Sequence, residues 1–265
     1  MDPFTKNDPP LISIITPTYN SSRFISQTIR SVLVQSYRHW EMLLVDDCSL
    51  DDTCDIVESF AKEDNRIRLT RLTRNIGAAR ARNVAFKQAK GSYLAFLDSD
   101  DLWLPAKLEN QLAFMQQGNI AFSYTWYRYI TEMGEDIGNI IQPPLSFTYE
   151  KLLKQTGIAC MTVMIDRDQT GAFEMTDIRT RNDFVLWLHL LKKGFIARCL
   201  QQDLARCRIV KKSLSANKVK GAFQLWHVYR KIEKLGKVSS LWCFVNYAWH
   251  AYYKRKAIQE HPGGS

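Results

Sequence analysis

The chain has 265 residues, of which 46% are hydrophobic and 24% charged, a composition typical of a folded globular protein and not of a disordered one. No run of about 18 apolar residues occurs, so no membrane-spanning helix is expected. The first ten residues lack the apolar core of a secretion signal, and the six cysteines form no C-x-x-C pair. We therefore expect a cytoplasmic protein with reduced thiols and no zinc site of that kind.

Positive charge is concentrated near the C-terminus. The net charge of the whole chain is +9. Residues 204–258 carry 13 of the 36 basic residues and one of the 27 acidic residues, a net charge of +12, which leaves 23 basic and 26 acidic residues, a net charge of −3, elsewhere. This distribution predicts an anionic partner for the C-terminal segment: a membrane surface, a phosphorylated lipid or a nucleic acid.

The first 120 residues alternate short apolar runs, typical of buried strands, with helical patterns. We expect strands at 11–16, 42–45, 67–72 and 93–97, and helices at 22–35, 52–61, 77–89 and 105–117. Four such alternations predict an α/β fold with a mainly parallel sheet.

The rest of the chain is less regular. We expect strands at 120–129 and 162–165, a helix at 183–191, and a loop over 130–146, which contains two glycines and two prolines. Two amphipathic helices, separated near Gly236, are expected between residues 222 and 253. The chain thus divides into a main domain at 6–215 and a basic, aromatic helical extension at 216–260.

Polar clusters follow three of the expected strands. They are Pro17-Thr18-Tyr19-Asn20, Asp46-Asp47 and Asp98-Ser99-Asp100-Asp101. Because ligands bind beyond the carboxyl ends of strands in such sheets, we expect the clusters to form one site. Adjacent carboxylates repel one another unless a cation or a donor neutralises them, and Mg²⁺ or Mn²⁺ takes carboxylate oxygens beside substrate phosphates. Each cluster taken alone could also be a turn or a helix cap.

Two further segments offer charged groups. Arg80 and Arg82 lie in the expected helix at 77–89, where they are suited to phosphate contact or form a solvated helix face. Asp183 opens the expected helix at 183–191, as a helix cap or as a general base for an acceptor hydroxyl. The chain has no G-x-G-x-x-G loop after its first strand, which weakens a dinucleotide-binding interpretation.

Together these motifs resemble the family 2 glycosyltransferases of the GT-A fold, in particular the bacterial surface-polysaccharide branch that includes teichuronic acid, O-antigen and capsule enzymes. The resemblance is carried by residues 14–20, 44–49, 75–77, 81–83, 93–105, 162–166, 182–183, 186–188, 194 and 208–215. They occur in the family's order and at similar spacing, across roughly residues 10 to 215. Each motif alone is weak, but the ordered set is specific.

The resemblance implies an inverting glycosyltransferase with a Rossmann-like, mainly parallel sheet flanked by helices, a nucleotide-binding half at 10–125 and an acceptor half at 126–215. Its donor would be a nucleotide-sugar, usually a UDP-sugar. Its acceptor would be a glycan or a polyprenyl-diphosphate-linked glycan in cell-surface polysaccharide biosynthesis. Nucleic acid is not an expected partner, because no nucleic-acid-reading module is present.

The resemblance also implies residue roles. Asp183 would be the catalytic base, Asp101 with Asp100 would bind Mn²⁺ or Mg²⁺, and Arg208 is a candidate diphosphate contact. The nucleotide-binding residues would be Pro17, Thr18, Tyr19, Asn20, Asp46, Asp47, Arg82, Asp98, Ser99 and Asp100. The family more commonly has a Glu-Asp pair where this chain has Asn182-Asp183, which leaves the role of residue 182 open.

Other interpretations fit parts of the sequence. A sugar nucleotidyltransferase on a similar sheet would usually have a Gly-rich phosphate loop where this chain has residues 17–20. A non-catalytic nucleotide- or membrane-binding module of the same fold would not need the acidic set that is intact here. The extension either packs its aromatic residues on the main domain or docks the enzyme peripherally on the inner face of the cytoplasmic membrane.

Overall fold

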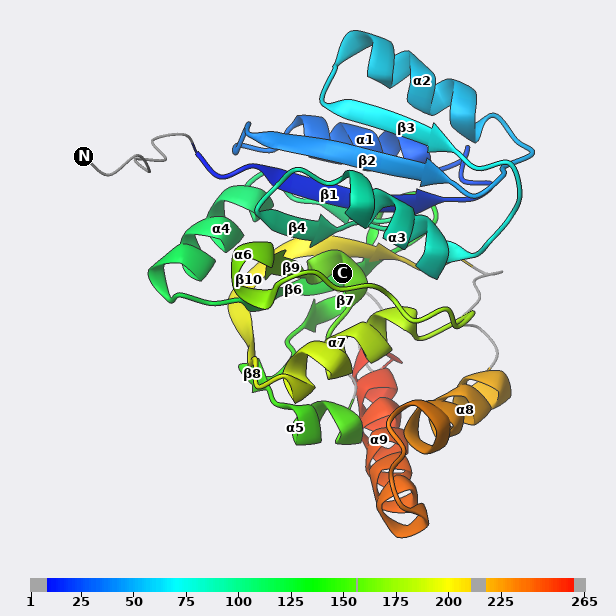
Figure 1. Cartoon of the computed structure of the whole chain (residues 1–265), viewed down its shortest axis with the longest axis vertical. Helices are drawn as coiled ribbons and strands as arrows, with labels where there is room; N and C mark the ends of the chain where they lie inside the picture. The colour runs from blue at the N-terminus through cyan, green and yellow to red at the C-terminus, as the bar shows by residue number, and fades with distance from the viewer. Residues whose placement is uncertain (1–8, 156, 211–217, 260–265) are drawn as a thin grey trace.

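The computed structural model describes residues 9–155, 157–210 and 218–259. A central sheet has helices on both faces, and the C-terminal helices project from one end of the molecule (Figure 1). The strand order is β3-β2-β1-β4-β9-β6-β10-β5, with β7 added to β6 and β8 added to β10.

The N-terminal half confirms the expected alternation of strands and helices. The strands are β1 (Ile12–Thr18), β2 (Trp40–Asp46), β3 (Ile67–Arg71) and β4 (Tyr93–Phe96). The helices are α1 (Ile25–Leu33), α2 (Thr53–Glu63), α3 (Ala78–Gln88) and α4 (Lys107–Gln117). The pairs β1–β2, β1–β4 and β2–β3 are all parallel, so the carboxyl ends of these strands lie at the same edge.

Burial on both faces explains why these strands are continuous apolar runs. In β2, Met42 and Leu44 belong to the hydrophobic cluster shared with α1, α2 and α4, whereas Leu43 and Val45 belong to the cluster shared with α3 and the later helix α7 (Asn182–Lys192). Alternate side chains of one strand thus enter two different cores, and each core fixes the register of the strand.

The second half of the sheet is mixed and differs in part from the expectation. Its elements are β5 (Leu102–Trp103), β6 (Phe122–Ile130), β7 (Asp136–Ile141), β8 (Ser146–Phe147), α5 (Tyr149–Lys154), β9 (Met164–Asp166), α6 (Arg167–Thr170) and β10 (Ala197–Arg208). The expected loop at 130–146 is wrong in its interior, where β7 pairs with β6. The strand β10 was not expected. Beyond β4, β9 runs antiparallel to both of its neighbours.

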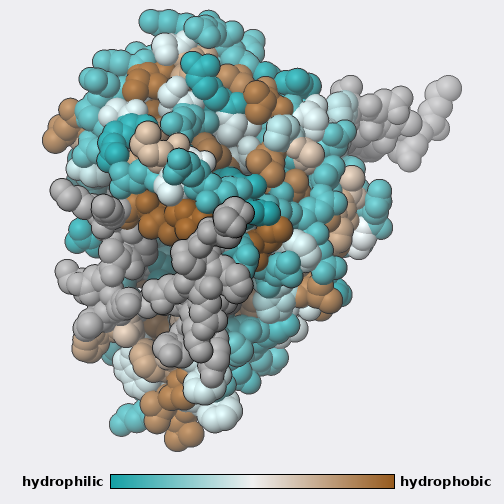
Figure 2. Space-filling model, turned by 180° about the vertical axis from the view of Figure 1, so that it is seen from behind, coloured by the Kyte–Doolittle hydropathy of each residue, from teal (hydrophilic) through white to brown (hydrophobic). Residues whose placement is uncertain are grey.

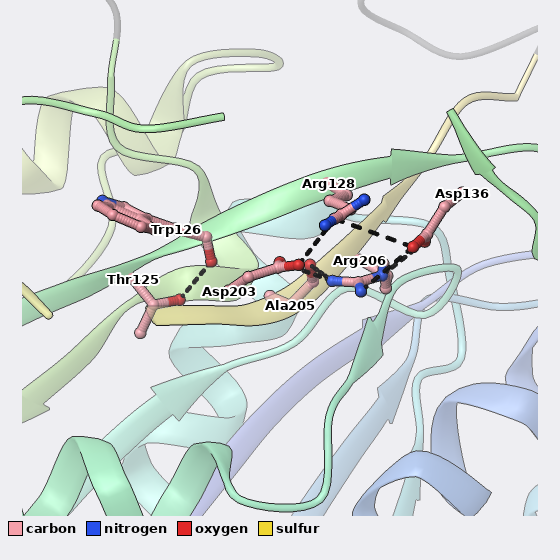
Figure 3. Close-up of polar contacts among 7 residues, drawn as sticks. All are labelled: Thr125, Trp126, Arg128, Asp136, Asp203, Ala205 and Arg206. Carbon is pink, nitrogen blue, oxygen red and sulfur yellow. Dashed lines mark hydrogen bonds and ion pairs between the residues drawn. The ribbon is translucent and has the colours of Figure 1, made fainter. Parts of the chain in front are cut away.

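An ion-pair network fixes the irregular pairing between β6 and β10 (Figure 3). The register shifts on both sides of Asp203. Its carboxylate accepts from Arg128 Nε at 2.8 Å and from Arg206 Nη1 at 2.7 Å. The Nε of Arg206 also lies 2.7 Å from Asp136 Oδ1 on β7. Two cations and two carboxylates therefore compensate one another and attach β7 to the bulged strand.

The C-terminal extension packs on the main domain. It consists of α8 (Lys218–His227), a π-helical turn (Val228–Ile232) and α9 (Lys237–Gln259), which confirms two helices with a break near Gly236. Leu225, Tyr229 and Cys243 are buried in the same core as α5 and α7. Within the described residues, no helix is long and apolar enough to cross a membrane.

Candidate functional site

The carboxyl ends of β1, β2 and β4 meet at one edge, and polar residues there bond across the loops. Thr18 Oγ1 donates to Asp46 Oδ1 at 3.0 Å. The hydroxyl oxygens of Ser21 and Ser99 lie 2.7 Å apart, although the two residues are 78 positions apart in the chain. The three polar clusters identified in the sequence therefore converge on one region of the structure.

The loops that follow β1 and β2 hold each other in place. The backbone N–H of Asn20 donates to Ser49 Oγ at 2.9 Å, and Asn20 Oδ1 accepts the N–H of Leu50 at 2.8 Å. Asp46 Oδ2 in turn accepts the N–H of Ser49 at 2.8 Å. Pro17 lies inside the buried strand β1, whereas Tyr19 is 48% exposed. The Tyr19 ring therefore offers an aromatic face on which a base can stack.

Asp47 fixes the turn that leads into α3. Its buried carboxylate accepts the backbone N–H of Ile76 at 2.6 Å and that of Gly77 at 2.8 Å. The Nδ2 of Asn75 donates to the Asp47 carbonyl oxygen at 3.1 Å. Each carboxylate oxygen keeps a second lone pair, so recognition of a nucleobase by Asp47 would use acceptor capacity that the turn leaves free.

The acidic loop, residues 98–101, concentrates negative charge in a poorly solvated place. Burial, with repulsion from Asp98, raises the pKa of Asp100 to about 6. Burial, with the charges of Asp100 and Asp98, raises the pKa of Asp101 well above its ordinary value. Raised carboxyl pKa values mean that the protein alone does not fully compensate the ionised form.

These carboxylates fit a divalent cation that is shared with a phosphate ligand. No group of three His, Cys, Asp or Glu side chains in 9–155, 157–210 or 218–259 is arranged to hold a metal by itself. Mg²⁺, however, is commonly bound through one or two carboxylates, with phosphate oxygens and water as the other ligands. Asp100 and Asp101 could supply such a pair, and a bound diphosphate would then complete the coordination.

A threonine of α1, Thr28, contacts the backbone of the acidic loop. Thr28 is fully buried, and its Oγ1 lies 3.0 Å from the carbonyl oxygens of both Ser99 and Asp101. The single hydroxyl proton can be donated to either of these two carbonyl oxygens. Thr28 therefore links the backbone of the acidic loop to α1.

Arg208, at the end of β10, is built into the same loop. Its backbone N–H donates to Asp101 Oδ1 at 2.8 Å, and its Nε donates to the Asp100 carbonyl oxygen at 2.7 Å. Its Nη1 donates to the Glu132 carbonyl oxygen and its Nη2 to Gln27 Oε1, both at 2.8 Å. All three guanidinium nitrogens thus donate to protein oxygens, and Arg208 links the second half of the sheet to the acidic loop.

Arg82 connects the acidic loop to the start of α7. It is buried on α3, where its Nη2 pairs with Asp98 Oδ1 and its Nη1 donates to Asn182 Oδ1 at 3.0 Å. Burial is the largest single effect and disfavours the charged guanidinium, but the negative charges of Asp98, Cys160 and Asp183 together raise the pKa of Arg82 above its ordinary value. The guanidinium therefore lies between the residues proposed for the donor and the residue next to the candidate base.

Asp183 lies in the first turn of α7, and its Oδ1 accepts the N–H of Phe184 at 2.8 Å. Burial raises the pKa of Asp183, and the nearby charge of Arg82 opposes this effect. A half-buried carboxylate with a raised pKa is suited to accept a proton. Arg181, two residues before Asp183, has a left-handed backbone with φ 60°.

Sequence patterns missed several residues that organise this site. Ser21 and Thr28 bind the acidic loop through hydroxyls, and Ser49 and Gln27 bind Asn20 and Arg208. Ser21 and Ser49 lie in loops, and Thr28 is a single polar residue on the buried face of α1, so no periodic pattern in the sequence distinguishes them. For Asn182, the signal in the sequence is that asparagine stands where the family more commonly has glutamate. In the structure its side-chain oxygen accepts a hydrogen bond from Arg82.

Residues 13–165 match the family model described as Glycosyl transferase family 2. The chain is 51% identical to TuaG of Bacillus subtilis (strain 168), provisionally named a teichuronic acid biosynthesis glycosyltransferase, over 93% of this chain and 98% of the relative. It is 41% identical to WfgD of Escherichia coli, a UDP-Glc:α-D-GlcNAc-diphosphoundecaprenol β-1,3-glucosyltransferase, over 82% of this chain and 85% of the relative.

Two solved structures share the fold of this chain. Residues 1–349 of S. aureus TarS, in complex with UDP-GlcNAc, match with a TM-score of 0.68 at 19% identity, over 91% of this chain and 72% of that one. The Pyrobaculum calidifontis mannosyltransferase PcManGT, in complex with GDP-Man and Mn²⁺, matches with a TM-score of 0.66 at 18% identity, over 95% and 76%. At these identities the likeness establishes the GT-A fold.

Replacing Arg82 by Met should destabilise the fold through loss of the buried bridge. We expect the free energy of unfolding to fall by about 3 kcal/mol, the low end of the effect of breaking a buried pair, because Asp98 keeps 32% of its side chain exposed. Urea denaturation followed by circular dichroism measures this change.

Arg80, two residues away on α3, provides the matched control. It pairs with Asp177, but both side chains are about half exposed, so Arg80→Met should change stability by less than about 1 kcal/mol. Equal losses in the two variants would contradict the importance of the Arg82 bridge.

Proposed function

The chain belongs to glycosyl transferase family 2, and from this premise we propose that it is an inverting, metal-dependent enzyme of bacterial surface-polysaccharide biosynthesis. Its donor is a UDP-sugar and its acceptor a lipid-linked glycan. The observation that carries the proposal is the convergence of Asp98–Asp101, Arg82 and Asp183 at the carboxyl edge of the sheet. The names of the relatives point to the same chemistry, because WfgD uses UDP-Glc and a GlcNAc-diphosphoundecaprenol.

In this proposal the loops at the end of the sheet bind the nucleotide. The exposed ring of Tyr19 stacks on the base, and Thr18 and Asp47 provide polar contacts to it. Asp100 contacts the ribose, and Asp101 with Asp100 would hold Mn²⁺ or Mg²⁺. The remaining members of the nucleotide site are Pro17, Asn20, Asp46, Arg82, Asp98 and Ser99. Arg208 lies on the diphosphate side of the site and bonds to Asp100 and Asp101 of the acidic loop.

Transfer proceeds in this proposal as a single in-line displacement at the anomeric carbon. Asp183 accepts the proton of the acceptor hydroxyl as the hydroxyl oxygen bonds to the sugar and the bond to the UDP oxygen breaks. The attack comes from the face opposite the leaving group, so the anomeric configuration inverts. A bound divalent cation supplies Lewis-acid stabilisation of the charge that develops on the diphosphate.

Binding of UDP should depend on a divalent cation. In a thermal shift measurement we expect UDP with Mn²⁺ to raise the melting temperature, since a ligand at a hundred times its Kd stabilises by about 2.7 kcal/mol. UDP without Mn²⁺, and GDP or CMP with Mn²⁺, should give smaller shifts. Asp101→Asn should abolish the Mn²⁺-dependent part of the shift.

An equal shift for UDP with and without the metal, in the presence of EDTA, would contradict a cation at the acidic loop. A larger shift for GDP or CMP would contradict the assignment of the base. The same measurement, extended to a panel of UDP-sugars, selects the donor for activity assays.

Replacing the proposed base should stop transfer without stopping donor binding. We expect Asp183→Asn to lower kcat by about 10²–10⁴-fold, the usual contribution of a general base, while the UDP and Mn²⁺ thermal shift is retained. UDP release is measured with the selected UDP-sugar and a GlcNAc-diphosphate-lipid acceptor. Transfer at the unsubstituted rate in Asp183→Asn would rule out this role.

The same assay has an expected pH dependence. A base must be ionised to act, and burial holds the pKa of Asp183 above its ordinary value, so activity is lost as pH falls through that raised pKa. The acidic limb of the rate profile should therefore lie above the ordinary aspartate range near pH 4. A limb at or below that range would contradict a half-buried Asp183 as the base.

We further propose that the C-terminal extension docks the enzyme on an anionic membrane. Brown, apolar surface lies at the lower end of the molecule, where α8 and α9 project (Figure 2). The exposed apolar residues of α9 recur every three or four positions and thus share one face: Val238, Leu241, Trp242, Val245 and Trp249. Basic residues accompany them, since Arg230 and Lys231 line an open hollow with Phe223 and Trp226. Tryptophan and basic residues together favour a membrane interface.

This surface predicts binding to vesicles. The chain should co-sediment with vesicles that contain phosphatidylglycerol at low salt, and less so with purely zwitterionic vesicles. The double variant Trp242→Gln, Trp249→Gln should bind these vesicles at least about tenfold more weakly. Leu50→Gln, a change of similar polarity at an exposed residue after β2, should have no effect. Failure of the unsubstituted chain to bind anionic vesicles would overturn the docking proposal.

A further inference from the structure

The backbone two residues before the proposed base adopts an unfavourable conformation. Arg181 has φ 60° and ψ 21° and is the N-cap residue of α7. The left-handed region is uncommon for residues other than glycine, and such residues persist where their surroundings impose them. Asn182 and Asp183 follow immediately, so whatever holds Arg181 also sets the position of both.

The C-terminal helices hold Arg181. Its Nη1 donates to Tyr247 Oη on α9 at 2.7 Å, and its Nη2 donates to the carbonyl oxygen of Gly221 on α8 at 3.2 Å. The guanidinium carbon also lies 5.2 Å from the centre of the Tyr247 ring, within the range of a cation–π contact. One side chain thus bonds to both helices of the extension.

The neighbours of Arg181 make contacts to the same two helices. Thr180 Oγ1 hydrogen-bonds to Gln224 Oε1 on α8. The Phe184 ring packs edge-to-face on Tyr247, with 6.0 Å between ring centroids. Residues 180, 181 and 184 therefore all contact the extension, on either side of Asn182 and Asp183.

The opposite end of α7 also contacts the extension, but far from the base along the helix. Lys192 Nζ lies 3.1 Å from Glu233 Oε2, and the same carboxylate accepts from Tyr149 Oη at 2.6 Å. Lys192 lies eleven positions after Arg181 and ten after Asn182. The two ends of α7 thus allow a comparison between a contact to the extension far from the base and a contact to the extension next to it.

We propose that Arg181 is a positioning residue for the catalytic base, and that the extension completes the acceptor side of the active site through it. The proposal rests on the function proposed above for Asp183. Bonds from Arg181 to Tyr247 and Gly221 fix the left-handed turn, and this turn fixes the Asp183 carboxylate relative to the Arg82 bridge. Small displacements of a catalytic group cost large factors in rate.

Electrostatics give Arg181 a second effect on the same carboxylate. The pKa of Asp183 is raised by burial and by Asp98 on the loop after β4, and it is lowered by Arg82 on α3 and by Arg181 itself. Cys160, in the turn before β9, also interacts with Asp183. Loss of the Arg181 charge should therefore raise the pKa of the base and move the acidic limb of the rate profile to higher pH.

Three variants of the full chain test the proposal. Tyr247→Phe removes the hydroxyl that accepts from Arg181 but keeps the ring. We expect kcat to fall about tenfold, since a hydrogen bond to a charged group contributes on this scale, with KM for the UDP-sugar and the UDP and Mn²⁺ thermal shift unchanged. Arg181→Met should lower kcat at least as much and also shift the acidic limb upward, whereas Tyr247→Phe should not shift it. The double variant should lose no more than Arg181→Met alone, because the two residues act through one contact.

Lys192→Met is the matched control. It removes the contact at the far end of α7, so it should lower stability without lowering kcat. The proposal is overturned if Tyr247→Phe and Arg181→Met keep the unsubstituted kcat, or if they lose donor binding in step with kcat, as general unfolding would cause. Asp183→Asn separates the two levels: if it retains transfer, the proposed function fails, and if it loses transfer while the Arg181 and Tyr247 variants do not, only the positioning role fails.

Discussion

A buried guanidinium holds the two halves of the site together. Arg82 lies on α3, and it bonds to Asp98 after β4 and to Asn182 at the start of α7. The acidic loop can tolerate its density of carboxylates in part because this cation is placed beside it. Since a buried charge is stable only with partners, neither the loop nor α7 can move far without leaving Arg82 unpaired. Arg82 thus links the acidic loop directly to the helix that carries the candidate base.

The part of the site built on the first half of the sheet could be predicted from the sequence, because the signals for its strands and polar clusters are local. Each strand of the first half is buried on both faces, so it is a short apolar run, and each polar cluster follows its strand directly. In a parallel sheet, position at the end of a strand is enough to place Thr18, Asp46 and Asp98 at one edge. No knowledge of long-range pairing was needed, and the observed contacts between Thr18 and Asp46 confirm the expectation.

The second half of the sheet depends on contacts that no local pattern encodes. The strand β10 contains Gln, Asp and Arg, and its register shifts on both sides of Asp203, so its alternation is broken. The segment 130–146 has the glycines and prolines of a loop, yet β7 forms there by pairing with β6, and Asp136 at its start bonds to Arg206 on β10. The family resemblance implied Arg208 as a diphosphate contact, but its bonds to Asp100 and Asp101 come from a contact over more than a hundred residues.

The exchange at residue 182 follows from the same electrostatic constraint. An asparagine oxygen accepts the hydrogen bond of Arg82 without adding charge, whereas a glutamate there would pair with Arg82 in competition with Asp98. A second carboxylate beside Asp183 would also raise the pKa of the base further, in a place where burial already raises it. With an amide at 182, the positive charge of Arg82 acts on Asp98 on one side and on Asp183 on the other. The uncharged Asn182 side chain thus leaves the charge of Arg82 to be shared by the acidic loop and Asp183.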